Sequence, residues 1–306
     1  MTPKQVVLLV GHAFWWGAAY VFAALALRGF SPVLLVSLRL ALAALVLAAL
    51  LQATGDGIGD AARLLRERPG AVLVLAVTVS AAPFGLITSG QDYIPAGTTA
   101  VLISSVPLWA ALLGVRLDRS QRVGARQGVG LVLGFCGVAL VVGAETVQTA
   151  DELLGAGLVL LGAAAVAIGN FYSQSRFADE PPMTRATLTA ALAAVVLAPG
   201  AAATGDADLG LTPVVGLIGL AVGSTALLLV LTFALIDAVG PRRAALSAYL
   251  APAFALLLSA IVLDEAITVA AVGGLVLIVS GVVLAARPAP APVEAVAGGP
   301  AVTPRG

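Results

Sequence analysis

Long apolar stretches alternate with short polar breaks along almost the whole chain. Read with a window of about 20 residues, the length that lets a helix cross roughly 30 Å of hydrocarbon, the pattern predicts ten transmembrane helices. The predicted spans are residues 6–27, 33–51, 71–90, 98–115, 127–142, 153–174, 186–203, 213–238, 244–262 and 266–286. Continuous apolar runs indicate helices, since barrel strands would show alternating segments of about ten residues. We therefore expect an all-α integral membrane fold, with the ten helices in one bundle.

The overall composition agrees with this class. Hydrophobic residues make up 60% of the chain and charged residues only 10%, which is outside the range of soluble globular proteins. The formal net charge is zero, so nothing indicates a surface for nucleic acid. The partners expected from composition are therefore the lipid bilayer and a small molecule.

The positions of the basic residues predict how the bundle is oriented, because Lys and Arg are retained on the cytoplasmic side of the cell membrane. With the N-terminus inside, fourteen of the 16 basic residues fall on cytoplasmic segments: Lys4, Arg63, Arg66, Arg68, Arg116, Arg119, Arg122, Arg126, Arg176, Arg185, Arg242, Arg243, Arg287 and Arg305. Acidic residues dominate the opposite loops. Both termini are thus predicted to be cytoplasmic, and the Pro- and Ala-rich tail 288–306 is predicted to be disordered.

The chain also contains an internal repeat. A shift of 145 residues lays 92–116 over 237–261 without a gap and matches Asp92 with Asp237 and Pro107 with Pro252. The repeat divides the chain into two five-helix halves, 1–146 and 147–287. Because five is odd, the second half enters the membrane from the opposite side, which gives an inverted-topology repeat. The charges agree: "RLDRSQR" follows the fourth span, and the acidic "LDEAIT" follows the ninth.

Several of these stretches resemble a known family. "WWGAAYVFAALALRGFSPVLLVSLRLALAALVL" combines Trp16-Gly17, Ser31-Pro32 and an arginine in the second span, and it resembles the opening of EamA-domain proteins of the drug/metabolite transporter superfamily. The resemblance covers roughly residues 6–286. It implies a ten-helix transporter with a central cavity that exports or imports amino acids or other small metabolites. The sequence departs from the family at Arg119, where the first half usually carries an acid, and at "AVAIGN", where a tryptophan is common.

The chemistry within the spans favours solute binding over catalysis. The spans contain one His and one Cys and no cluster of nucleophiles, bases or metal ligands, so we expect neither an enzyme nor a metal or other cofactor. Hydroxyl, amide and aromatic groups without a midplane cluster of Lys or Arg suit a neutral, zwitterionic or amphipathic solute. The residues expected to bind substrate are Trp16, Tyr20, Trp109, Asn170, Tyr172 and Tyr249.

Three further residues are expected to act as gates. Pro107 and Pro252 occupy equivalent positions in the fourth and ninth spans, and each removes a backbone hydrogen bond. Arg39 lies six residues past Val33, about 9 Å into the second span at 1.5 Å per residue. A lipid-facing charge at that depth is costly, so we expect Arg39 to face the bundle, bonded to outer carbonyls or to an acid such as Asp92 or Glu265. Arg39 could hold the outer gate or contact the substrate, and we favour the gate.

The functional prediction is a secondary transporter that works by alternating access. No nucleotide-binding motif is present, so the energy would come from a gradient or from the solute itself, and a proton is one candidate coupling ion. His12 could relay a proton or serve as a helix contact, and both readings stay open. The alternative function is a non-transporting membrane scaffold or accessory subunit, which would have a solid centre filled by Ala and Leu. The expected assembly is a monomer or weak homodimer.

Overall fold

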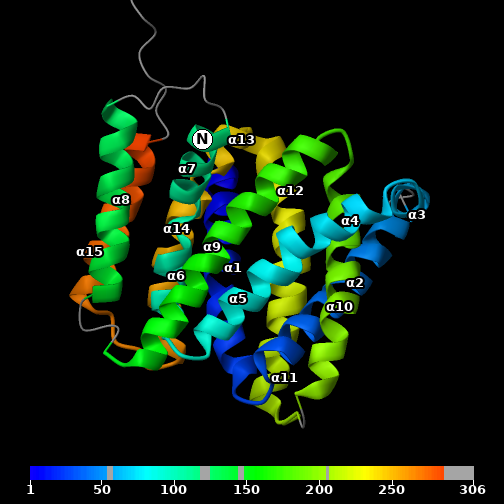
Figure 1. The fold of residues 1–306 in the computed structure, drawn as a ribbon, viewed down its shortest axis with the longest axis horizontal. Coiled ribbons are helices and arrows are strands. Elements are labelled where there is room, and N and C mark those ends of the chain that lie inside the picture. The colour runs from blue at the N-terminus through cyan, green and yellow to red at the C-terminus, as the bar shows by residue number, and fades with distance from the viewer. Residues whose placement is uncertain (54–57, 118–124, 144–147, 205–206, 286–306) are drawn as a thin grey trace, which may run out of the picture.

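The computed structural model describes residues 1–53, 58–117, 125–143, 148–204 and 207–285, and every regular element in these ranges is helical. Arg119 and the tail 288–306 lie outside the described residues. Most of the bundle consists of long apolar helices: α1(Pro3–Leu27), α2(Pro32–Ala53), α8(Ala125–Gly143), α9(Ala150–Phe177), α10(Pro182–Ala203) and α15(Val269–Ala285). Each coincides with one of the expected spans (Figure 1).

Four further spans are interrupted helices. The third is α4(Pro69–Ala76), η1(Val77–Ala81) and α5(Ala82–Gln91), and the eighth is α11(Leu211–Ile218), η2(Gly219–Leu227) and α12(Leu228–Val239). The fourth consists of α6(Ala96–Ile103) and α7(Val106–Leu117), and the ninth of α13(Pro241–Ala244) and α14(Ser247–Val262). Among the described residues, eight helices have the length and apolar composition of a membrane span, while α14 and α15 are apolar but shorter. The chain is therefore a multi-pass membrane protein.

The interruptions are similar in the two halves. Both η1 and η2 are π-helical segments in the middle of their spans. In the fourth span, the hydroxyls of Ser104 and Ser105 donate to the carbonyls of Val101 and Leu102, and these bonds end α6 one turn before Pro107. The third and fourth spans of each half are thus irregular where the others are continuous.

The element α3(Ile58–Glu67) was not expected from the sequence, which left residues 52–70 as a connection. It is a short amphipathic helix with an ion pair between Arg63 and Asp60 on its polar side. On its apolar side, Leu64 is buried against Val72 and Phe177. The sequence did not predict α3 because the helix is only ten residues long and contains many polar residues, so its apolar face does not form a long apolar run.

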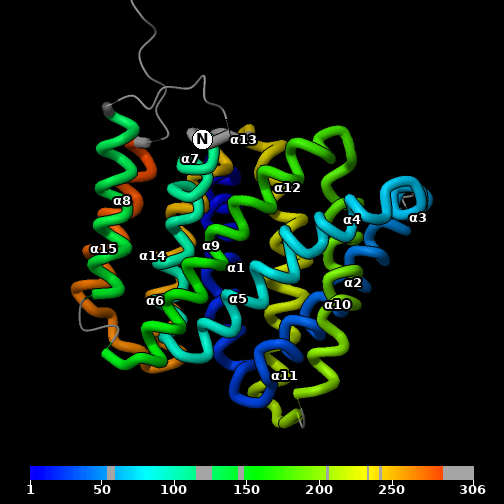
Figure 2. The backbone as a smooth tube through the Cα atoms, viewed as in Figure 1, coloured from blue at the N-terminus to red at the C-terminus, as the bar shows by residue number. Residues whose placement is uncertain are grey.

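Many helices of the first half pack against helices of the second half. The helix α2 lies along α10, and α8 lies along α15, so second spans pair with each other and so do fifth spans. Likewise α1 packs against α14 and α11, while α9 packs against α6, α7 and α5. Figure 2 shows the α8–α15 pair at one end of the bundle and the α2–α10 pair at the other. This reciprocal packing fits an inverted two-repeat fold.

Small residues allow the closest helix contacts. A Cβ at Gly137 would lie 2.8 Å from the carbonyl oxygen of Gly274, where α8 crosses α15. A Cβ at Gly17 would lie 2.6 Å from the carbonyl oxygen of Ala251, where α1 crosses α14. Glycine is needed at both crossings because the backbones of neighbouring helices touch there.

Candidate functional site

A cavity of about 300 Å³ lies between helices of both halves. Its walls come from α2, α4, η1, α5, α9, α10, η2 and α12. They are mostly apolar, with hydroxyl groups and one arginine: Leu40, Leu47, Leu75, Val79, Ser80, Phe84, Ser173, Pro182, Arg185, Ala186, Thr189, Ala190, Thr225 and Leu229. A volume of this size is at the small end of the range for sites that enclose organic molecules.

Both π-helical segments contribute to the cavity wall. Val79 and Ser80 come from η1, and Thr225 comes from η2. The hydroxyl of Thr225 donates to the carbonyl of Leu220, five residues earlier, at 2.8 Å. Such segments displace side chains from regular helical positions and are frequent at functional sites.

Arg39 does not itself line this cavity, but it contacts two residues that do. Its Nε donates to Oγ1 of Thr225 at 3.0 Å, and its guanidinium carbon lies 4.2 Å from the ring centroid of Phe84. Thr225 and Phe84 both line the cavity. The side chain is buried, with only 8% exposed. Arg39 therefore faces the bundle, between a helix of the first half and a helix of the second.

Of the two kinds of partner expected for Arg39, outer carbonyls or an acid, the prediction of an acid is wrong. Among the described residues no carboxylate lies within 4.0 Å of it. Glu265 instead accepts the backbone N–H groups of Ala96 at 2.8 Å and Gly97 at 3.0 Å. These are orphan donors at the start of α6, so the carboxylate caps that helix and cannot also pair with Arg39.

A second arginine belongs to the cavity wall itself. Arg185, in the first turn of α10, donates from Nη1 to the hydroxyl of Ser173 at 2.9 Å. Its Nε is buried and has no partner in the described structure. The α9–α10 connection beside it lies on the same side of the bundle as the N-terminus (Figure 1). Arg185 thus places one part of the cavity wall near that side, while Phe84 and Thr225 form the part of the wall beside Arg39.

Two of the expected substrate residues lie beside Arg39. The Tyr20 side chain is near enough to the guanidinium to interact with it electrostatically, and Trp16 lies one turn earlier on the same helix, α1. Its backbone carbonyl accepts from Nε2 of Gln91 at 2.6 Å, which ties α1 to α5. Trp16 in turn meets His12 edge-to-face, with ring centroids 5.8 Å apart. The structure therefore brings Trp16, Tyr20 and Arg39 together.

The other four expected substrate residues lie elsewhere, and none lines this cavity. Trp109 meets Phe135 edge-to-face at 5.3 Å, and Tyr249 packs on the apolar cluster around α6, α8 and α15. Tyr172 donates to the carbonyl of Ala71 at 3.4 Å, in the cluster that holds α3. Asn170 is exposed on α9. A role for these four in binding remains a prediction.

The two prolines differ in their surroundings. Pro107 is exposed in the first turn of α7, whereas Pro252 is buried inside α14. Their positions match in the sequence repeat, but one begins a helix and the other bends one. A gating role for either proline remains a prediction.

His12 has a defined tautomer and an unused nitrogen. Its Nε2 lies 2.8 Å from Oγ1 of Thr232, and the hydroxyl hydrogen of Thr232 is donated to the carbonyl of Leu228 at 2.7 Å. His12 must therefore be the donor, with its proton on Nε2. The Nδ1 atom is buried without a partner in the described residues. His12 is thus at least a contact between α1 and α12.

Sequence reasoning did not single out Phe84, Thr225 or Arg185. Phe84 looks like one more apolar residue, and Thr225 like a hydroxyl bonded to its own helix. Arg185 was assigned to a basic connection because it lies near a span end, although it belongs to the first turn of α10. One available signal was that α2 and α10, equivalent in the repeat, both begin with proline and carry an arginine within their first two turns.

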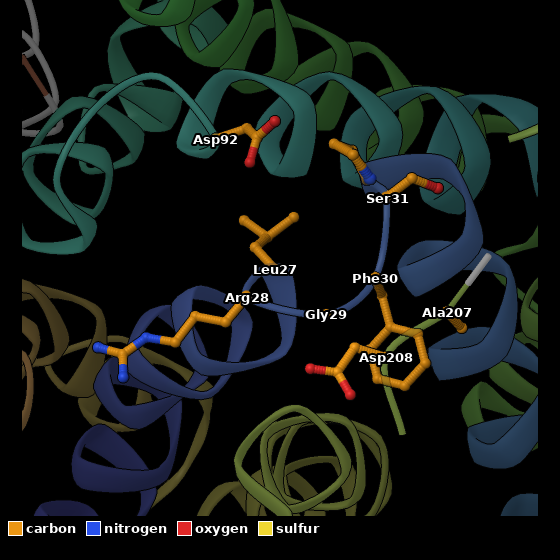
Figure 3. Close-up of a pocket in the computed structure, with 9 residues that line it drawn as sticks. Leu27, Arg28, Gly29, Phe30, Ser31, Asp92, Ala207 and Asp208 are labelled. Carbon is orange, nitrogen blue, oxygen red and sulfur yellow. The ribbon is translucent and has the colours of Figure 1, made fainter. Parts of the chain in front are cut away.

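A broader depression lies on the face opposite the N-terminus. It has a volume of about 580 Å³ and is formed by the turn 27–32 with Asp92, Ala207 and Asp208. Figure 3 shows Asp92 and Asp208 on either side of the turn that carries Leu27 and Arg28. Partial burial raises the pKa of the Asp92 carboxyl above its ordinary value. The depression is open and is formed mainly by the turn 27–32 and the segment that carries Asp208.

Comparisons with known proteins agree with this architecture. The family model of the EamA-like transporter family matches the chain twice, at residues 3–143 and 153–287. A Bacillus subtilis (strain 168) protein, Uncharacterized transporter YoaV, is 22% identical over 175 residues, 57% of this chain and 58% of that protein. An Archaeoglobus fulgidus uncharacterized transporter is 24% identical over 196 residues, 64% of this chain and 66% of that protein. The matched region thus spans less than two thirds of either relative.

The fold also resembles a solved structure. A crystal structure of a protein that is 19% identical superposes with a TM-score of 0.64 and covers 94% of this chain and 98% of that chain. At this identity the similarity concerns the fold alone. It shows that the arrangement of helices extends over nearly the whole length of both chains.

Proposed function

Because the chain belongs to the EamA-like transporter family, and is thus a membrane transporter, we propose that it is a secondary transporter that exports a small organic metabolite, such as an amino acid, by alternating access. The observation that carries this proposal is the cavity itself. Its walls come from both halves, and both π-helical segments contribute to them. A movement of one half against the other would therefore change access to it.

The contacts around the cavity support a resting state that is closed on the face opposite the N-terminus. On that face, Gln91 bonds the backbone of Tyr20, and Glu265 bonds the start of α6. On the side of the N-terminus, the cavity reaches Pro182 and Arg185 at the beginning of α10. In the cycle we propose, the first set of contacts opens when the helices around Arg185 close.

The distribution of basic residues supports a cytoplasmic location for the N-terminal side. Arg176 lies in the last turn of α9 and Arg185 in the first turn of α10, and the connection between these two helices is on that side of the bundle (Figure 1). The state with the cavity near Arg185 is then the one that loads solute from inside. This order of events supports export as the direction.

The cavity also argues against a non-transporting scaffold. A scaffold needs only a well-packed centre, and dispersion contacts favour filling any space there. Here the space between the halves is open and carries the hydroxyls of Ser80, Ser173 and Thr225. Polar groups around a space for a small molecule support a binding role.

Metabolite profiling tests the proposal. Cells that express the chain and cells that lack it would be compared for metabolites inside and in the medium, with an Ala186→Phe variant as a control that fills the cavity. We expect one class of metabolite to fall inside and rise outside only with the unaltered chain. Equal profiles for all three cultures, with equal protein in the membrane, would contradict export.

A further inference from the structure

Arg39 is a buried cation without a counter-ion. Its side chain is only 8% exposed, and no carboxylate of the described residues lies within ion-pair distance. A buried charge is ordinarily paired, because removal from water is costly when nothing of opposite sign compensates. Its hydrogen-bond and ring partners, Thr225 and Phe84, are both neutral. The described residues therefore leave this positive charge uncompensated.

The unbonded part of the guanidinium has the geometry of an anion site. Nε is occupied by Thr225, while the two terminal nitrogens form no hydrogen bond within the described residues. These nitrogens also retain contact with open space, since neither is among the buried polar atoms that lack a partner. Two parallel N–H groups on one edge of a guanidinium match the two oxygens of a carboxylate.

We propose that Arg39 binds the carboxylate of the transported solute, which makes the substrate class a small organic acid or amino acid with an apolar body. This inference rests on the proposed function and specifies its substrate. The carboxylate approaches along the cavity wall formed by Phe84 and Thr225. The ring of Phe84 and the hydroxyl of Thr225 hold the guanidinium in position until the anion arrives.

The rest of the cavity selects the body of the solute. Its remaining wall is mainly aliphatic, including Leu40, Leu75 and Leu229, and this surface suits an apolar side chain. The cation in the cavity lining itself is Arg185, at the beginning of α10. Arg185 can attract an anion to the entrance, and Arg39 can hold it inside.

The single positive charge of Arg39 favours one carboxylate group over a phosphate ester as its ligand. A phosphate carries close to two negative charges at neutral pH and ordinarily needs several donors or cations around it. Arg39 offers one free guanidinium edge, and Arg185 lies at the opposite end of the cavity. One carboxylate at Arg39 leaves the site neutral.

Thermal unfolding of the purified full chain in detergent tests the inference. The probes are the twenty L-amino acids and the matching carboxamides, which differ only at the carboxylate, with pyruvate, succinate and inorganic phosphate as further anions. The variants are Arg39→Gln, Arg39→Lys and the control Arg63→Gln, which removes an exposed arginine paired with Asp60. We expect at least one free acid to raise the melting temperature of the unaltered chain by several degrees and its carboxamide to have no effect.

The Arg39 variants separate a binding role from a structural one. Arg39→Gln should lose the response to the acid while its melting temperature without ligand stays equal or rises, because an uncompensated charge has been removed. Arg39→Lys should respond at concentrations at least tenfold higher, and Arg63→Gln should respond normally. If Arg39→Gln does not fold, the Arg39→Lys titration decides: an unchanged response would overturn the inference.

Other outcomes overturn it as well. Equal responses to acids and carboxamides, a response to phosphate alone, or no response to any acid would each rule out a carboxylate site at Arg39. The proposed function fails separately, by the absence of metabolite export from cells. A chain that exports a neutral solute and is unaffected by Arg39→Gln would remain a transporter without this site.

Discussion

Arg39 and Thr225 are joined by a hydrogen bond of 3.0 Å that links α2 of the first half to η2 of the second. Thr225 can accept this bond because its own hydrogen is directed to the carbonyl of Leu220. The bond therefore depends on the π-helical register of η2. It fixes the guanidinium beside the cavity and connects the two halves at a place where the proposed cycle would separate them.

Replacement of Thr225 by valine, which has nearly the same shape, should weaken this connection. The variant leaves Nε of Arg39 buried without its acceptor, at a cost of about 1–3 kcal/mol in the free energy of unfolding. Transport should fall more than in Thr187→Val, which removes only a bond to Met183 within α10. Equal thermal stability and equal transport for the two variants would show that the Arg39–Thr225 bond has no special role.

Glu265 should stabilise the closed form of the face opposite the N-terminus. Glu265→Ala removes the acceptor for the N–H groups of Ala96 and Gly97, with a loss of about 0.5–2 kcal/mol, the usual range for a helix cap. Labelling of a cysteine introduced at exposed Tyr93, on the same face, should then be faster. The matched control is Asp264→Asn, because Asn accepts the positive φ of 56° found there. Unchanged labelling in Glu265→Ala would contradict the assignment.

A side chain at Gly137 should destabilise the protein, because α8 and α15 are in close contact there. Gly137→Ala places a Cβ 2.8 Å from the carbonyl of Gly274, so the helices must separate, at a cost of about 1–3 kcal/mol. Gly143→Ala, which meets nothing within 4 Å, is the control and should be as stable as the parent or slightly more so. The measurement is the melting temperature of the purified variants. Equal values would show that the two helices are less closely packed.

Asp92 should make the protein slightly less stable as the pH rises. Partial burial raises the pKa of its carboxyl in the folded state, so the folded chain binds this proton more tightly than the unfolded chain does. The ionised carboxylate is therefore the destabilising form, and its effect grows as the pH rises through the acidic range. Asp92→Asn should gain stability relative to the parent at pH 7, and the gain should shrink at pH 4. A gain that is independent of pH would contradict burial as the cause.

Much of the fold could be predicted from the sequence because the bilayer restricts the choices. Each expected span coincides with a helix or an interrupted helix, since a backbone in hydrocarbon must satisfy its own hydrogen bonds. The interruptions were less visible. The sequences "VTVSA" and "GLAVGSTAL" contain no signal that predicts a π-helix. The hydrogen-bond register of a π-helix depends on the packing around the cavity.

The site could be predicted only in part. Trp16, Tyr20 and Arg39 are visible as polar or aromatic residues on two neighbouring spans, and the structure places them together. The partners of Arg39 were not predictable, because hydropathy gives no distance between helices. Glu265, one of the expected partners, instead accepts a backbone N–H group at the start of α6. Trp109 and Tyr172 illustrate the opposite case, since each has aromatic or backbone contacts of its own away from the cavity.

Transport of a solute through the cavity is tested most directly by counterflow. Proteoliposomes would contain the purified chain and would be supplied with a panel of labelled amino acids and organic acids. Ala186→Phe should block exchange because Ala186 lines the cavity, while Val195→Phe on the exposed side of the same helix should exchange normally. We expect exchange of at least one solute by the parent and by Val195→Phe, and none by a folded Ala186→Phe. Exchange that is unaffected by Ala186→Phe, or no exchange by a correctly folded parent, would contradict transport through this cavity.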